Sequence, residues 1–315
     1  MQKATYPPLR THKKLTKGQL GLHIFFILLS LCYVLPLILL ISISFDGSSV
    51  TNFSLIPKVF TLNAYKMVFA TPGRILNGYK VTTFYSVFGT LSSLVVMMMF
   101  AYSISRPNFV LRNPLTFILF FTTLFSGGLV PSYLLNTRYL HLNNTIWIYI
   151  LPSMISAWNV IVIKTYLKGL SVELFEAARL DGASELRICF TIILPLSTPV
   201  LASVGFLDFI NRWNNWYTSQ IYITKPELRS LQYLLKLILD NLDELKSMQQ
   251  EGSLDQSLVE VLDNLESVRF AMAVVAAGPM MLIFPFFQKY FAKGMTIGAV
   301  KGYGGLCPQP LRFAR

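Results

Sequence analysis

Charged residues are absent from six long stretches of this chain, each of at least 19 residues. A helix that crosses a bilayer needs roughly 20 mainly apolar residues, so each stretch is long enough to cross once. The stretches are continuously apolar and lack the alternation of a barrel strand, which favours helices. We therefore expect an all-α membrane protein with six transmembrane helices. Their cores are expected at residues 20–43, 82–103, 115–135, 145–164, 193–213 and 270–290.

The overall composition agrees with a multi-span membrane protein. Hydrophobic residues make up 53% of the 315 positions and charged residues only 13%, about half the charged share of an ordinary soluble domain. These values exclude a disordered chain, a collagen, a disulfide-rich miniprotein and an ordinary cytosolic enzyme. No small-residue cleavage pattern follows the first span, so we expect it to remain as an anchor. Cys32, Cys189 and Cys307 form no disulfide framework and receive no chemical role.

Lysine and arginine are unequally divided between the two sides that six spans define. The side holding both termini and the loops 104–114 and 164–192 carries 16 of them, and the opposite side, counted up to residue 268, carries nine. Because cytoplasmic loops are enriched in basic residues, both termini are expected in the cytoplasm. The net charge of +12 then reflects topology and attraction to anionic lipids, not nucleic-acid binding. The expected organisation is a basic tail (1–19), a transmembrane domain (20–290) and a second tail (291–315).

The longest hydrophilic segment lies on the outer side, and we expect its part 217–268 to be helical. From 225 to 268 it contains nine acids and four bases, a net charge of −5. Two apolar sets at helical spacing predict two amphipathic helices, the first with Pro226 in its first turn. These helices pack on each other over the bundle or present their polar faces to an external partner, and the two readings are compatible. The sets are Leu228, Leu231, Leu235, Ile238, Leu242 and Leu245, then Leu254, Leu258, Val261, Leu265 and Val268.

The inner loop 165–195 carries signals for two short helices around a tight turn. Ser171 suits an N-cap, and acids follow early in the helix, where its dipole favours them. Gly182 fits the left-handed position that ends a helix. Ser184 suits the cap of a second helix, which enters the fifth span near Pro195. A short helix with small residues lets a partner protein approach closely, and its acids offer charge-assisted contacts.

The same loop resembles a known family. The sequence E-A-A-x-x-x-G at 176–182, followed by I-x-L-P at 192–195, is similar to the EAA loop of permease subunits of bacterial ATP-binding-cassette (ABC) importers. The surrounding D-G-A-S at 181–184 looks like the carbohydrate-importer branch. A second match, F-x-K-G-M-T-I-G-A-V-K-G at 291–302, resembles the C-terminal signature of subunits related to the smaller maltose permease subunit.

A third match narrows the branch. S-G-G-L-V-P-S-Y-L-L at 126–135, W-N-N-W at 213–216 and L-Q-Y-L-L at 231–235 are similar to permeases for oligosaccharides and polysaccharide fragments. The resemblance covers residues 15–302, approximately. Residues 303–315 depart from the usual ending of the family and receive no function.

The resemblance implies a type I ABC importer permease that moves oligosaccharides or polysaccharide fragments into the bacterial cytoplasm by alternating access. It implies a coupling helix held in a cleft of a dimeric cytoplasmic ATPase, a second permease subunit in a heterodimer and an extracytoplasmic solute-binding protein. The chain itself would catalyse no reaction and bind no cofactor or metal; ATP and Mg²⁺ belong to the ATPase, and no phosphate-loop motif occurs here. The implied coupling residues are Glu173, Glu176, Ala177, Ala178, Leu180, Asp181, Gly182 and Ala183.

Charged residues inside a span usually mark a pathway or an ion pair. Asp208 and Arg212 lie one helical turn apart in the fifth span, so they form an intrahelical pair or a polar wall of a sugar pathway. Aromatic rings and amides nearby suit sugar rings and hydroxyls, although Trp and Tyr also anchor spans at the interface. The pathway candidates are Asp208, Asn211, Trp213, Asn214, Trp216 and Tyr217, with Asn143, Asn144, Trp147, Trp158 and Asn159 as weaker ones.

Two other classes of membrane protein remain as alternatives. An ion-coupled secondary transporter would carry repeats and buried acids, but no convincing repeat is visible. An intramembrane enzyme would need a nucleophile–base pair or a metal cluster, and no such motif is present. Glycines 127 and 128 with Pro131 are expected to interrupt or kink the third span, and Pro152, Pro199, Pro279 and Pro285 to do so elsewhere.

Overall fold

The computed structural model of the chain describes residues 17–46, 55–70, 72–250 and 267–285. Regular structure in these ranges is helical; the only β-type pairing there is an isolated bridge between Asp46 and Phe60. The principal helices are α1 (Lys17–Ser44), α2 (Asn63–Val68), α3 (Pro72–Ser105), α4 (Arg112–Leu124), α5 (Leu129–Leu134), α6 (Ala157–Lys168), α7 (Val172–Leu180), α10 (Thr198–Trp213), α11 (Tyr217–Tyr222) and α12 (Leu231–Gln250). A last helix spans Ser267–Pro285.

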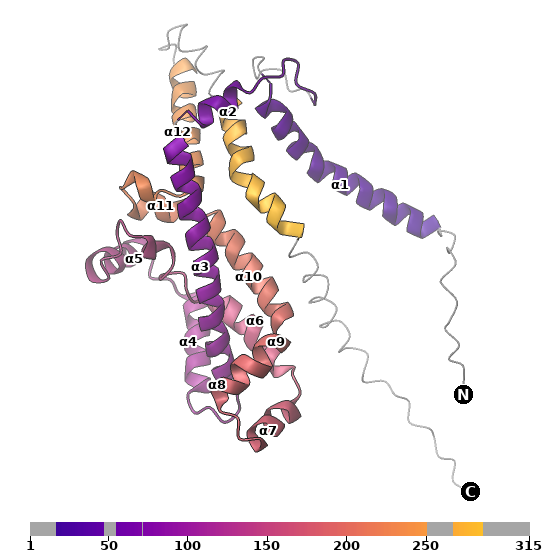
Figure 1. Cartoon of the computed structure of the whole chain (residues 1–315), viewed down its shortest axis with the longest axis vertical. Coiled ribbons are helices and arrows are strands. Elements are labelled where there is room, and N and C mark those ends of the chain that lie inside the picture. Colours follow the sequence, from indigo (N-terminus) through magenta and orange to yellow (C-terminus); the bar gives the residue numbers. More distant parts are fainter. Residues whose placement is uncertain (1–16, 47–54, 71, 251–266, 286–315) are drawn as a thin grey trace.

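Helix α3 is the central element of the bundle. Its 34 residues give a rod about 50 Å long, and its most extensive contacts are with α10 and α6. In Figure 1 it runs from the end of the molecule that holds α12 to the end that holds α7. A buried apolar cluster around Met97, Ile104, Ile163 and Ile193 joins these helices near the α7 end.

The structure confirms long apolar helices but not six uninterrupted ones. In the described ranges, three single helices are long and apolar enough to cross a membrane: Lys17–Ser44, Gly73–Ser105 and Ser267–Pro285. Two further candidates are bent pairs. Arg112–Leu124 meets Leu129–Tyr139 at 116°, and Glu185–Leu196 meets Thr198–Trp213 at 81°, which raises the count to five if each pair is one span.

The expected third span is interrupted where its glycines lie. Helix α4 ends at Leu124, and Gly128 takes a positive φ of 82° immediately before α5. Glycine adopts this conformation without the Cβ clash that other residues suffer. The predicted interruption by Gly127 and Gly128 is therefore confirmed. By contrast, Pro279 lies inside the continuous helix Ser267–Pro285 and does not interrupt it.

The expected fourth span, residues 145–164, is not one helix. A short 3₁₀-helix occupies Ile146–Tyr149, an irregular segment follows over 150–156, and α6 begins only at Ala157. Pro152 lies in the irregular segment, where it removes a backbone donor. Ser156 then caps α6 by accepting a hydrogen bond from the Asn159 amide at 3.4 Å. The sequence did not predict this break, because residues 139–163 form one uncharged, mainly apolar run.

Helix α12 confirms the first amphipathic helix of the outer loop, with a different start. Leu231 and Leu242 are buried, and the residues of the seam between them are half-buried. Pro226 does not open this helix; it opens a separate 3₁₀ turn, Pro226–Leu228, and the extended backbone of Arg229 separates the two. Most of the second set, from Leu254 to Leu265, lies outside the described residues, as do nearly all of the two tails.

Candidate functional site

The loop 165–195, named the coupling loop below after its predicted role, forms the helix, turn and helix that its sequence predicts. Ser171 stands at the N-cap of α7 with extended backbone, and its hydroxyl bonds the Glu173 carboxylate. Ser184 caps α8 (Glu185–Arg187) and accepts a hydrogen bond from the Arg187 amide at 3.4 Å. Ser184 thus satisfies an amide at a helix start that lacks an intrahelical partner, whereas the Ser171 side chain makes no capping hydrogen bond to a backbone amide.

The turn between the two helices depends on the backbone of Gly182. Its φ is +74°, and a Cβ added there would meet no atom within 4 Å. The Ala183 amide bonds the Ala178 carbonyl, and the Gly182 amide bonds the Arg179 carbonyl, each at 3.0 Å. This is the Schellman arrangement, in which a left-handed residue ends the helix. Conformation alone, and not lack of space, therefore favours glycine here.

Helix α7 has one face toward the bundle and one toward the surroundings. Phe175 and Ala178 are buried, whereas Leu180 is 89% exposed. The outward surface combines acids, a small residue and apolar side chains, and α7 lies at the far end of the bundle (Figure 1). Of the predicted coupling residues, those exposed are Glu173, Glu176, Ala177, Leu180, Asp181 and Gly182, and Ala183 is half-buried.

Two side chains that the sequence analysis did not single out, Tyr102 and Arg106, join the loop to the end of α3, and a pair within the loop, Arg179 and Glu185, adds to them. The Tyr102 hydroxyl donates to Glu185 Oε2 at 2.6 Å, and Arg179 Nε donates to Glu185 Oε1 at 2.9 Å. The Arg106 guanidinium lies 3.6 Å from the centroid of the Phe175 ring, within the range of a cation–π contact. Burial lowers the pKa of Arg106. The residues joined to Tyr102 and Arg106 are far from them in the sequence, by 83 residues for Tyr102 and Glu185, so no local signal predicted these contacts.

Asp208 and Arg212 form an ion pair, as their spacing predicts. Arg212 Nε lies 2.7 Å from Asp208 Oδ2, and both residues are buried. The remaining guanidinium donors bond the Ser93 hydroxyl of α3, the Tyr149 carbonyl, and both the hydroxyl and the carbonyl of Ser153 in the irregular segment 150–156. These distances are 2.7 to 3.1 Å. The Arg212 guanidinium therefore links α10 with α3 and with the segment around Tyr149 and Ser153, and its N–H donors have hydrogen-bond partners.

The room for this guanidinium comes from a glycine of α3. A Cβ added at Gly89 would lie 2.8 Å from Arg212 Nη1. The side chain is thus packed against bare backbone. This arrangement adds structural partners to the intrahelical pair and accounts for the burial of the charge.

The other pathway candidates divide into buried and exposed groups. Trp213 is buried and donates from Nε1 to the Ala276 carbonyl at 3.1 Å. Trp216 and Tyr217 are exposed and meet edge to face, with ring centroids 5.8 Å apart. Asn211 and Asn214 are also exposed. Only the exposed group offers rings and amides to a sugar, and its role remains a prediction.

Among the weaker candidates, Asn144 has a structural position. Its Oδ1 accepts hydrogen bonds from the Thr224 amide and hydroxyl and from the Lys225 amide, at 2.7 to 3.0 Å. It thereby joins the turn before Ile146–Tyr149 to the segment after α11. Trp147 and Trp158 are exposed, as is Asn143, and Asn159 is half-buried.

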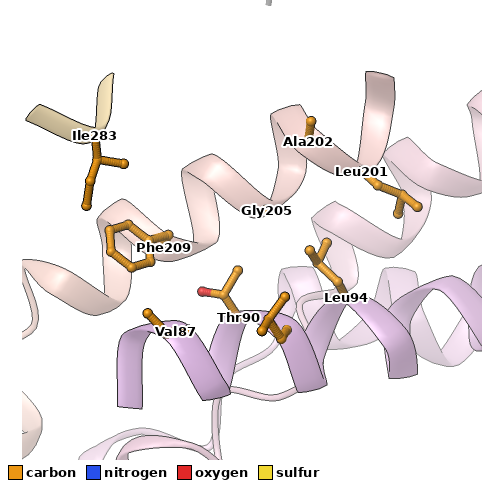
Figure 2. A pocket seen from close by; sticks show the side chains of 9 residues that line it. Val87, Thr90, Leu94, Leu201, Ala202, Gly205, Phe209 and Ile283 are labelled. Carbon is orange, nitrogen blue, oxygen red and sulfur yellow. The ribbon is translucent and has the colours of Figure 1, made fainter. Parts of the chain in front are cut away.

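A cavity of about 370 Å³ lies between α3 and α10 and is reached by Ile283 of the last helix (Figure 2). Its walls are apolar except at Thr90, whose buried hydroxyl has no partner within the described part of the chain. A sugar needs a hydrogen-bond partner for most of its hydroxyls. This cavity therefore suits apolar groups and not the predicted substrate.

Comparison with known proteins identifies the family. Residues 70–297 match the family described as "Binding-protein-dependent transport system inner membrane component". The chain belongs to this family. The resemblance of the EAA-like loop to importer permeases is thus confirmed, and this importer permease is a transport subunit rather than an enzyme. Its family and its apolar helices make it a cell-membrane protein.

Its relatives include proteins of Bacillus subtilis (strain 168). The polygalacturonan/rhamnogalacturonan transport system permease protein YtcP is 34% identical over 281 residues, covering 88% of this permease and 96% of YtcP. Protein LplC is 35% identical over 272 residues, with coverage of 85% and 90%. A solved bacterial ABC transporter involved in the import of the acidic polysaccharide alginate has a chain of 28% identity and TM-score 0.75, covering 90% of this permease and 100% of that chain.

Proposed function

We propose that this permease and a second permease subunit form a path for oligosaccharides or polysaccharide fragments into the bacterial cytoplasm. A solute-binding protein delivers the sugar outside, and a dimeric ATPase inside drives alternating access by gripping α7. The polysaccharide importers among the relatives support the substrate class. The observation that carries the mechanism is the exposed face of α7, which ends at the left-handed Gly182.

The proposed orientation places α7 and both chain termini in the cytoplasm and α12 outside. The excess of basic residues on the α7 side supports it. The second permease subunit is supported by α1, an apolar helix whose buried residues are confined to Ser42, Ile43 and Ser44. Figure 1 shows α1 inclined away from α3, so most of its surface is available to lipid and to a partner.

Co-purification and transport test this function together. The tagged permease should bring down an ATPase chain and a second permease, and liposome uptake should require both ATP and the binding protein. An ATPase can switch the membrane subunits only by binding one of their states better, so hydrolysis and uptake should rise together. Uptake driven by an ion gradient without ATP would instead support a secondary transporter.

Replacing Trp216 and Asn214 together with alanine should change the dependence of transport on sugar. Both side chains are exposed next to the end of α10, and loss of a stacking ring and an amide should raise the apparent KM for uptake about tenfold. Assembly with the ATPase should not change, because neither residue lies near α7. Uptake measured over a series of sugar lengths is the readout.

A matched replacement of Phe117, an aromatic residue of α4 that is also exposed and is not a pathway candidate, controls for general loss of an aromatic residue. An unchanged substrate profile in the Trp216/Asn214 variant would remove both residues from the pathway.

A further inference from the structure

The C-terminal end of α3 and the residue that follows it contact the coupling loop at two points. The first is Glu185, whose carboxylate bonds Tyr102 of α3 with one oxygen and Arg179 of α7 with the other. The second is the Phe175 ring, covered by the Arg106 guanidinium just beyond the end of α3. Residues from α7, α8 and α3 therefore meet in one polar cluster, beside a cavity of about 320 Å³ that Arg106, Arg179 and Glu185 help to line.

The two bonds of Glu185 differ in strength. The Arg179 and Glu185 side chains are 40% and 53% exposed, and such a surface pair contributes little because water screens it. Tyr102 is buried, with 6% of its surface exposed, and its hydroxyl approaches the carboxylate at 2.6 Å. A charge-assisted bond of this length is a strong one. The bond from Tyr102 of α3 is therefore the stronger of the two bonds that Glu185 makes.

Helix α3 offers an unbroken route away from the coupling loop. It runs without interruption from Pro72 to Ser105. The route along the chain from α8 to α10 instead passes a π-helical segment, Ile188–Ile193, and the 81° bend. A continuous helix transmits displacement along its axis, whereas a π segment and a bend provide compliance.

The far part of α3 contacts the elements expected on the outer side. Thr82 Oγ1 accepts a hydrogen bond from the Leu231 amide at the start of α12, at 3.0 Å. The Tyr85 hydroxyl donates to the Arg212 carbonyl at 3.1 Å, and Ser93 accepts from the Arg212 side chain. One rod therefore connects the coupling loop with α10 and α12.

We propose that Glu185, which follows the Gly182 turn at the start of α8, and Tyr102 form a clamp that passes movement of the α7–α8 loop to α3. They are positioning residues: they act on α3 and do not themselves meet the ATPase or the sugar. The inference rests on the proposed function, since it needs an ATPase that moves α7. It adds a second mechanical path to the one that runs along the chain into α10.

The test uses the complete importer in liposomes, with Tyr102→Phe and Glu185→Ala as single and double variants. Tyr102→Phe keeps the ring that packs near Phe175, at a centroid distance of 6.4 Å, and removes only the hydroxyl. Each variant should assemble and hydrolyse ATP at close to the normal rate when the binding protein is present. The sugar moved per ATP hydrolysed should fall about fivefold or more, within the usual range of coupling factors.

Two controls sharpen the result. Asp240→Asn breaks an exposed ion pair with Lys236 on α12 and should leave the sugar-to-ATP ratio unchanged. The Tyr102→Phe/Glu185→Ala variant should lose no more than Glu185→Ala alone, because the two residues share one bond and their effects are not additive.

An unchanged ratio in both single variants overturns the clamp. Loss of the ATPase from the purified complex of either variant also overturns it, because the residues would then hold the ATPase interface instead of passing on its movement. Failure of the proposed function would give a different result, because the unaltered permease would then co-purify with no ATPase.

Discussion

Arg212→Met should lower the free energy of unfolding by about 3–5 kcal/mol, the usual cost of leaving a buried charge without its partner. Asp208 would stay buried in α10 without its cation, and Ser93, Ser153 and the Tyr149 carbonyl would each lose a donor. The irregular segment 150–156 would lose the hydrogen bonds from Arg212 to Ser153 that link it to α10. Thermal or denaturant unfolding of the purified complex in detergent measures the change.

The matched variant removes both charges of this pair. Asp208→Leu/Arg212→Met should recover part of the lost stability, because an apolar pair avoids the unpaired carboxylate. Recovery should be incomplete, since the donors to Ser153 and Tyr149 are still missing. A double variant as unstable as Arg212→Met would show that the ion pair is not the source of the effect.

Gly182→Ile should abolish ATP-driven uptake and reduce the ATPase recovered with the permease at least about tenfold. An L-residue at φ +74° costs roughly 1–2 kcal/mol, and more for a β-branched side chain. The helix end would adopt another conformation and displace Ala183 and Ser184, so the exposed face of α7 would no longer fit its partner. Co-purification and uptake measure the two losses separately.

Asparagine is the matched control at this position because it tolerates left-handed backbone better than other residues with a Cβ. Gly182→Asn should retain much of the uptake, and the second permease should co-purify with both variants. The proposed role of the turn fails if Gly182→Ile transports normally. If the Gly182→Ile variant no longer co-purified with the second permease, the substitution would have caused a general folding defect instead.

The sequence identified most of the coupling loop because its signals are local. Ser171 and Ser184 occupy N-cap positions, Ser184 accepts a hydrogen bond from a backbone amide three residues away, and Gly182 ends a helix by its left-handed backbone. The glycines of the third span and the leucine spacing of α12 are local signals of the same kind. The roles of the coupling and pathway residues, in contrast, depend on chains that bind this one, and they stay predictions.

By itself, the sequence determined that this chain is a helical membrane protein, because charge-free runs of this length are stable only in a bilayer or a core. Only the tertiary structure decided that residues 150–156 leave the helix, that Arg212 holds them, and that Tyr102 bonds Glu185. Those facts join residues 59 to 83 positions apart. A buried charge or a broken helix is stable only where distant groups supply the missing hydrogen bonds, and the linear pattern does not contain that information.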